Sequence, residues 1–152
     1  MRVNTPTDLS AIAYLSSAVR AFTDDELDAL LVDSRAFNNS VQVTGVLLHH
    51  DRSFFQYLEG PADGVTLVYG RVTSSRRHRG LIQLLSGPVA QRHFTSWHMG
   101  FAEAPGSALQ SLAQAEWLDT QPALDQRAAD GPLPPGLRLL TKFWQTWTQG
   151  QA

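Results

Sequence analysis

Alternation of apolar with small or polar residues predicts five β-strands. In residues 10–16, Ile12 and Tyr14 fall on one face, and two alanines and a leucine fall on the other, as in a strand whose side chains point alternately to its two faces. The same pattern predicts strands over residues 41–50, 53–59, 81–85 and 96–101, with Asp51-Arg52 as the turn of a hairpin between the second strand and the third.

Two helices are expected between these strands. Thr23, followed three residues later by Glu26, forms a capping box, and the leucines after it recur at helical spacing. Pro61 suits the first turn of a second helix, since its missing N–H has no partner there in any case. Two more helices are predicted at about 107–118 and 137–148, separated by a connector rich in Pro and Gly.

The order β-α-β-β-α-β-β places the chain in the α+β class. It matches a ferredoxin-like sheet with two helices on one face, which leaves the other face to be covered by something else. The last helix carries Phe143, Trp144 and Trp147, an aromatic load that would not stay exposed, so we expect the C-terminal helices to pack on that second face. Residues 10–102 form the predicted domain and 103–152 a helical extension.

Composition and charge narrow the possible functions. Of the 152 residues, 43% are hydrophobic and 17% are charged, as in ordinary globular proteins. The net charge of −2 favours neither nucleic acid nor an anionic membrane as a partner. Without cysteine there is no disulfide or thiolate site, and the five histidines lack metal-ligand spacing. No stretch approaches a membrane span of about 20 apolar residues, so we expect a cytoplasmic protein.

Several polar residues lie on faces that should be buried. The apolar stripe of the first helix continues into Ser34 and Asn38, and Gln56 shares a strand face with Phe54 and Leu58. A buried amide without a partner costs about 1–3 kcal/mol, so each needs a hydrogen-bonding group. Backbone groups or a water molecule could be the partners of Ser34 and Asn38. Gln56 could instead be an exposed amide on an edge strand, which would need no buried partner.

Other residues are ambiguous when taken alone. Tyr14 is typical of a structural tyrosine, although a phenol is also a potential electron and proton donor. Trp97 and Met99 are typical of core residues. The basic run at residues 76–79 could bind a phosphate or be a solvated surface. No motif of a hydrolase, a P-loop protein or a dinucleotide-binding protein is present, and we expect no enzymatic activity.

Taken together, the motifs of residues 10 to 102 resemble the BLUF family of blue-light sensors. Their joint order and spacing carry the resemblance, rather than any single motif. They are Ala13-Tyr14-Leu15-Ser16, Ser34 with Asn38, Thr44-Gly45-Val46-Leu47-Leu48, Phe54-Phe55-Gln56-Tyr57-Leu58-Glu59-Gly60, Arg77-His78, and Phe94 with Trp97-His98-Met99-Gly100.

The resemblance implies a bound flavin, usually FAD, with its ring between the two helices and beside the sheet face that carries Tyr14 and Gln56. Asn38 would hydrogen-bond the ring edge, with Ser34 beside it. The excited flavin would draw an electron and a proton from Tyr14, and recombination would leave Gln56 rotated or tautomerised. The product would be a slightly red-shifted state that decays in the dark.

The resemblance also assigns less central roles. Arg71, Arg77 and His78 would lie along the ribityl and phosphate side of the flavin. Trp97 and Met99 would occupy the site next to Gln56 in turn, and their strand would relay the change to the tail helices. The chain departs from the family at Phe37, where several members have a polar residue, and at Ser75, which replaces an acidic residue. Because of these departures, the bound flavin could be FMN instead of FAD.

The leading prediction is therefore a blue-light photoreceptor that signals through an unidentified partner protein. A ferredoxin-like interaction module without photochemistry is the main alternative, and a flavin-dependent reductase is a third. Because the sheet and the amphipathic tail both offer apolar faces, we also expect a homo-oligomer.

Overall fold

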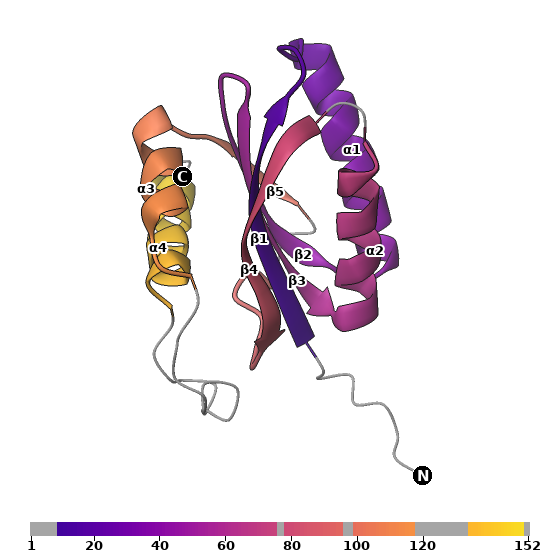
Figure 1. Cartoon of the computed structure of the whole chain (residues 1–152), viewed down its shortest axis with the longest axis vertical. Coiled ribbons are helices and arrows are strands. Elements are labelled where there is room, and N and C mark those ends of the chain that lie inside the picture. The colour runs from indigo at the N-terminus through magenta and orange to yellow at the C-terminus, as the bar shows by residue number, and fades with distance from the viewer. Residues whose placement is uncertain (1–8, 76–77, 96–98, 118–133, 151–152) are drawn as a thin grey trace.

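A mixed five-stranded sheet forms the centre of the molecule, which confirms the α+β assignment. The computed structural model describes residues 9–75, 78–95, 99–117 and 134–150. The elements are β1 Leu9–Ala18, α1 Asp24–Ser40, β2 Thr44–His50, β3 Ser53–Pro61, α2 Ala62–Thr73, β4 His78–Val89, β5 Gly100–Glu103, α3 Gly106–Gln114 and α4 Pro135–Gly150. The strand order is β4-β1-β3-β2-β5; α1 and α2 cover one face, and α3 and α4 lie on the other (Figure 1).

The first helix begins where the capping box predicts. The amide of Glu26 donates to Thr23 Oγ1 at 3.1 Å, and the amide of Thr23 donates to Glu26 Oε1 at 2.9 Å. The helix ends at Ser40, with Val41 as its C-cap and Gln42 at a φ of 62°. The expected strand over 41–50 was therefore wrong in its first three residues, and β2 starts at Thr44.

The bounds of four other elements differ from the expectation. β4 extends over twelve residues because it pairs antiparallel with almost the whole of β1. β5 begins at Gly100 and ends at Glu103, whereas residues 96–98 of the expected strand lie outside the described residues. α3 ends at Gln114, before the expected residue 118, and α4 begins two residues before the expected start.

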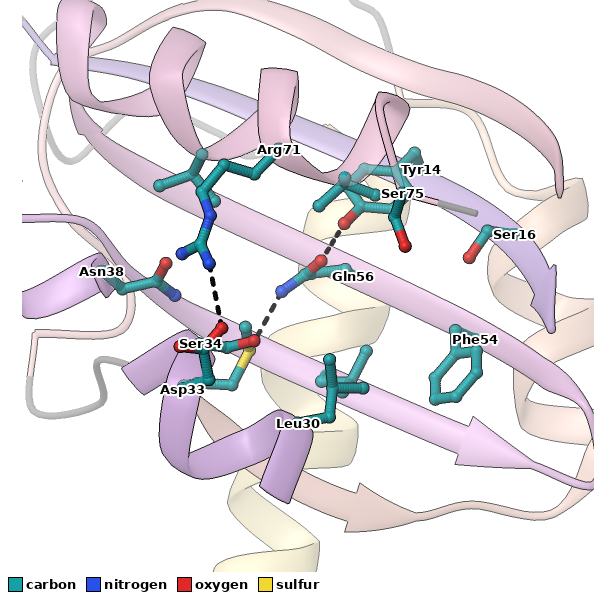
Figure 2. Close-up of a pocket in the computed structure, with 14 residues that line it drawn as sticks. Tyr14, Ser16, Leu30, Asp33, Ser34, Asn38, Phe54, Gln56, Arg71 and Ser75 are labelled. Carbon is teal, nitrogen blue, oxygen red and sulfur yellow. Dashed lines mark hydrogen bonds and ion pairs between the residues drawn. The ribbon is translucent and has the colours of Figure 1, made fainter. Parts of the chain in front are cut away.

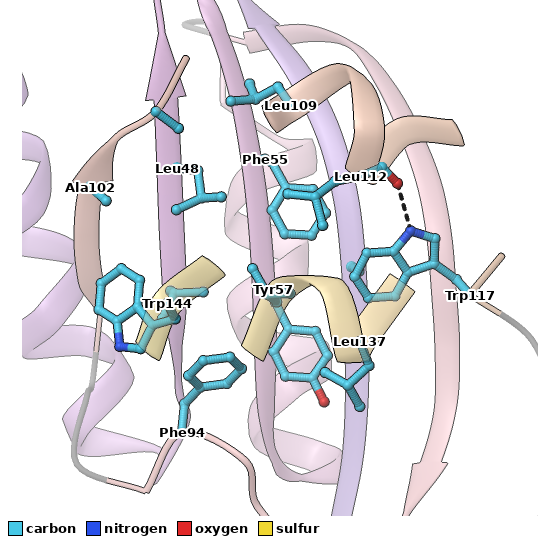
Figure 3. Close-up of a cluster of buried hydrophobic side chains, with 14 of the residues drawn as sticks. Leu48, Phe55, Tyr57, Phe94, Ala102, Leu109, Leu112, Trp117, Leu137 and Trp144 are labelled. Atoms are coloured by element: carbon cyan, nitrogen blue, oxygen red, sulfur yellow. Dashed lines mark hydrogen bonds between the residues drawn. The ribbon is translucent and has the colours of Figure 1, made fainter. Parts of the chain in front are cut away.

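Alternation along the strands creates two cores, one on each side of the sheet. The pocket-side core lies under α1 and α2, and includes Ile12, Tyr14, Phe54 and Leu58. The α4-side core lies under α3 and α4. Its members from the sheet, the loop before β5, α3, the segment after α3, and α4 include Ala11, Ala13, Phe55, Tyr57, Phe94, Leu109, Leu112, Trp117, Leu137, Leu140 and Trp144 (Figure 3). The prediction that the C-terminal helices pack on the second face is confirmed.

At two glycines, the ring of a tryptophan packs directly against the backbone, and both contacts involve α4. A methyl group on Gly100 would lie 2.6 Å from Cζ2 of Trp144, and one on Gly136 would lie 2.3 Å from Cε2 of Trp117. Both distances are far below van der Waals contact, so only glycine allows the indole rings to come so near. The first contact joins α4 directly to the start of β5.

We expect Gly100→Ala to destabilise the protein by about 1–3 kcal/mol, because the added methyl must push Trp144 out of its site. Gly70→Ala is the matched control: a methyl there meets nothing within 4 Å, and alanine favours the helix by about 1 kcal/mol. Urea unfolding of both variants measures the difference. Equal stability of Gly100→Ala and the parent would show that α4 does not rest on β5.

Candidate functional site

A cavity of about 250 Å³ lies between α1, α2 and the pocket-side face of the sheet. Figure 2 shows side chains from both helices and from the strands around it. Its lining combines apolar side chains with about as many polar ones, so a small molecule bound there would meet both apolar walls and hydrogen-bonding groups. The lining residues include Tyr14, Leu47, Phe54 and Gln56 from the strands, Leu30, Asp33, Ser34 and Asn38 from α1, Val68, Arg71 and Val72 from α2, and Met99 before β5.

A chain of hydrogen bonds runs across the floor of this cavity. Tyr14 and Gln56 are direct partners in the antiparallel register of β1 and β3, so their side chains leave the same face at the same level. The Tyr14 hydroxyl donates to Gln56 Oε1, and Gln56 Nε2 donates to the sulfur of Met99 at 3.0 Å. Gln56 is 5% exposed, so this buried amide has a partner at each end.

Burial keeps the Tyr14 phenol neutral. The side chain is 2% exposed, and this desolvation raises the pKa of Tyr14 well above the ordinary value near 10, with a smaller contribution from Tyr69. The two tyrosine rings are 5.2 Å apart between centroids. The hydroxyl is therefore a hydrogen-bond donor throughout the physiological range of pH.

The polar pair on α1 lies where the helical spacing predicts. Asn38 is 1% exposed and Ser34 is half-buried, and both line the cavity. The Asn38 carbonyl accepts from the amides of Val41 (3.2 Å) and Val43 (2.9 Å), which fixes the last turn of α1 above the sheet. Asn38 and Gln56, each able to donate and accept, thus reach one cavity from a helix and from a strand.

Arg71 joins α2 to α1 beside the cavity. Its guanidinium donates to Asp33 Oδ2 at 2.9 Å and lies 4.2 Å from the ring centroid of Phe37. Phe37, which departs from the family pattern, therefore serves as a platform for Arg71. Arg77, the side chain of His78 and Trp97 lie outside the described residues, so their expected roles stay predictions.

One contact near the cavity could not be read from the sequence. Arg35 Nε donates to the backbone carbonyl of Met99 at 2.9 Å and so holds the residue before β5 against α1. The two residues are 64 positions apart, and Arg35 belongs to the polar face of its helix. No local pattern links an exposed helical arginine to a distant main-chain oxygen.

The cavity suits a planar heteroaromatic ligand such as the flavin that the resemblance implies. Aliphatic side chains supply its walls, and the two amides and a hydroxyl can pair with carbonyl and N–H groups at a ring edge. In the described part of the chain, no three His, Asp or Glu side chains gather as a metal site would require. Among the same residues, no helix combines the length and hydropathy needed to span a bilayer.

Comparison with known proteins agrees with this geometry. The family model for BLUF, described as sensors of blue light using FAD, matches residues 9–100. The beta subunit of a photoactivated adenylate cyclase from Euglena gracilis is 32% identical over 90 residues, which is 59% of this chain and 10% of that protein. The chain thus corresponds to about a tenth of that relative.

Two solved structures share the architecture. One, BlrP1 BLUF, is 26% identical with a TM-score of 0.61, and the match covers 90% of this chain and 89% of that one. Another, Klebsiella pneumoniae BlrP1 with FMN and cyclic diGMP, is 27% identical with a TM-score of 0.58 over 71% of this chain and 27% of that one. This chain therefore belongs to the BLUF family of blue-light sensors.

Proposed function

We propose that this protein is a blue-light receptor that holds a flavin between α1 and α2 and signals through the hydrogen bonds of Gln56. The observation that carries the proposal is the chain from Tyr14 through Gln56 to Met99, which lines the cavity and is buried throughout. A phenol, an adaptable amide and a thioether in contact form a small set of groups that can adopt two arrangements.

The cofactor would be held chiefly by α1 and β3. Asn38 and Ser34 would pair with the polar edge of the ring, and Gln56 would reach it from below, since all three line the cavity. Val68 and Val72 of α2 would cover the apolar part. Arg71 would contact the ribityl chain of the flavin while keeping its ion pair with Asp33.

When bound, the flavin would absorb blue light and act as a transient electron acceptor. Tyr14 would give up an electron and its phenolic proton and then regain both, so nothing is oxidised or reduced at the end. The raised pKa of Tyr14 supports this coupling, because the buried phenol cannot release its proton without also losing the electron. Gln56, whose Oε1 accepts a hydrogen bond from the Tyr14 hydroxyl, would remain rotated or tautomerised, with altered hydrogen bonds to its neighbours.

Tyr14→Phe and Gln56→Leu should each retain the flavin and lose the light-induced red shift, because each removes one member of the chain. Tyr69→Phe is the matched control: its ring is the neighbour of Tyr14 but makes none of these bonds, and the shift should persist. Visible spectra before and after blue light, followed through dark recovery, provide the measurement.

A full shift in Tyr14→Phe or Gln56→Leu would remove that residue from the proposed mechanism. A parent protein that cannot be loaded with flavin at all would instead favour the interaction module without photochemistry. Bound flavin that does not respond to light would favour a reductase.

Asn38→Ala should weaken flavin binding roughly 10- to 100-fold, since a hydrogen bond to a buried group is worth about 1–3 kcal/mol once its partner is left unsatisfied. Asn39→Ala changes the exposed neighbour on the same helix turn and should leave the affinity unchanged. Titration of apoprotein with flavin, followed by fluorescence quenching, compares the two. Equal affinities would place the flavin elsewhere.

We expect the bound cofactor to be FAD, as the description of the family states. The flavin released by heat from protein purified from cells can be identified by mass spectrometry. Release of FMN, the flavin present in one solved structure of BlrP1, would contradict this expectation.

The output would pass to a partner protein through α3 and α4, which cover the face of the sheet opposite the cavity. This partner protein and the expected homo-oligomer remain predictions.

A further inference from the structure

Glu59 is a buried carboxyl group that the proposed photochemistry does not use. It is fully buried on β3, three residues beyond Gln56, and its side chain leaves the opposite face of the sheet. A carboxyl group is kept in such a place only when it is well hydrogen-bonded. The groups that bind it should therefore be held in place by it in turn.

Its partners come mainly from the loop between β4 and β5. Glu59 Oε2 accepts from the backbone amides of His93 (2.5 Å) and Phe94 (2.6 Å). Glu59 Oε1 accepts from the Tyr57 hydroxyl at 3.1 Å, and the ring Nδ1 of His93 lies 3.4 Å away. Four groups thus converge on two oxygens, which matches the accepting capacity of a carboxylate.

Arg92 anchors the same loop a second time. Its guanidinium donates to Gln42 O at 2.7 Å, to Thr44 Oγ1 at 2.8 Å and to Glu59 O at 3.4 Å. Residues 92 to 94 are therefore tied to the start of β2 and the end of β3. Hydrogen bonds to ionised groups are the stronger kind, so this is a firm attachment.

The anchored loop connects the two cores. Phe94 is 3% exposed in the α4-side core, with its ring centroid 5.5 Å from that of Tyr57 and 6.5 Å from that of Trp144 (Figure 3). Five residues later, Met99 belongs to the pocket-side core and accepts from Gln56. The next residue, Gly100, again touches Trp144.

Trp144 of α4 thus contacts both ends of one short segment. Phe94 is fixed through Glu59, whereas Gly100 adjoins the residue whose sulfur binds Gln56. Gly100 is bonded directly to Met99, so a displacement of Met99 would move Gly100 relative to the anchored Phe94. Such a movement would change the distance between the two contacts of Trp144.

We propose that Glu59 is a positioning residue of the photoreceptor, which holds residues 93 and 94 as the fixed point against which α4 responds to the state of Gln56. This inference rests on the proposed function, since it requires a light-driven change at Gln56. It adds to that function a residue on the far face of the sheet that touches neither the cavity nor Tyr14.

Glu59→Gln tests the role of the charge. The amide can keep its oxygen on the two backbone amides and turn its NH₂ group to Tyr57 and His93, so the shape is preserved while the charge is lost. Glu103→Gln is the matched control, because Glu103 is also a carboxylate beside a histidine, His49 Nδ1 at 2.7 Å, but lies on the surface of β5.

The experiment is hydrogen exchange of the flavin-loaded full chain in the dark and under blue light, with the visible spectrum recorded in parallel. Glu59→Gln should retain the red shift, exchange the amides of residues 93 and 94 faster in the dark, and reduce the light-minus-dark difference in α4 at least twofold. Glu103→Gln should behave as the parent. Tyr57→Phe removes one donor to Glu59 without changing the packing and should give a smaller reduction, which keeps the test available if Glu59→Gln fails to fold.

An undiminished light response of α4 in Glu59→Gln, or in Tyr57→Phe should the first variant not fold, would overturn the inference. A parent protein that shifts its spectrum without any change in α4 would overturn it as well, while leaving the proposed function standing. A parent without a spectral shift would overturn both, and the spectrum distinguishes that case.

Discussion

The buried amide of Gln56 is the constraint on which the site depends. Its two ends need different partners: the oxygen must accept and the nitrogen must donate. The Tyr14 hydroxyl can do either by rotating, but the Met99 sulfur can only accept. The orientation in which Gln56 donates to Met99 is therefore favoured, and the reversed orientation places an oxygen against the sulfur. The difference in free energy between the two orientations of the Gln56 amide is about that of one hydrogen bond, roughly 1 kcal/mol. A bound ligand with its own donors and acceptors can offset this difference.

The strand that carries this amide also separates it from the output helices. Phe55 and Tyr57, the neighbours of Gln56 in sequence, point into the α4-side core. Because they leave the other face, a rotation of Gln56 about its own side-chain bonds does not displace them. The direct route from Gln56 to α4 is instead through Met99, which the amide touches, and Gly100, which Trp144 touches. In the proposed mechanism, the sheet would therefore pass the change on through its edge strand β5 rather than from one face to the other.

The sequence predicted those features that depend on local periodicity. The spacing of Leu27, Leu31 and Asn38 turned the asparagine inward, and the alternation of β3 placed Gln56 on the face of Phe54, as the structure confirms. It did not predict that β2 starts only at Thr44, because Val41 reads as a strand residue although it caps α1. Contacts between distant segments were also beyond reach. The partners of Glu59 lie 34 and 35 residues away and are main-chain amides, which carry no signature in the sequence.

The packing of α4 sets a limit on the movement that the proposed light response could produce in this helix. Leu137, Leu140 and Trp144 are each at most 6% exposed, and burying a large apolar side chain is worth about 1.5–3 kcal/mol. Undocking α4 would forfeit all three contributions, roughly 5–9 kcal/mol, and would leave Phe55 and Tyr57 uncovered. A changed hydrogen bond at Gln56 supplies only about 1 kcal/mol once the flavin has returned to its ground state. The energies therefore favour a small shift of a helix that stays docked, and a partner that recognises α4 must do so on the surface it already exposes in the dark.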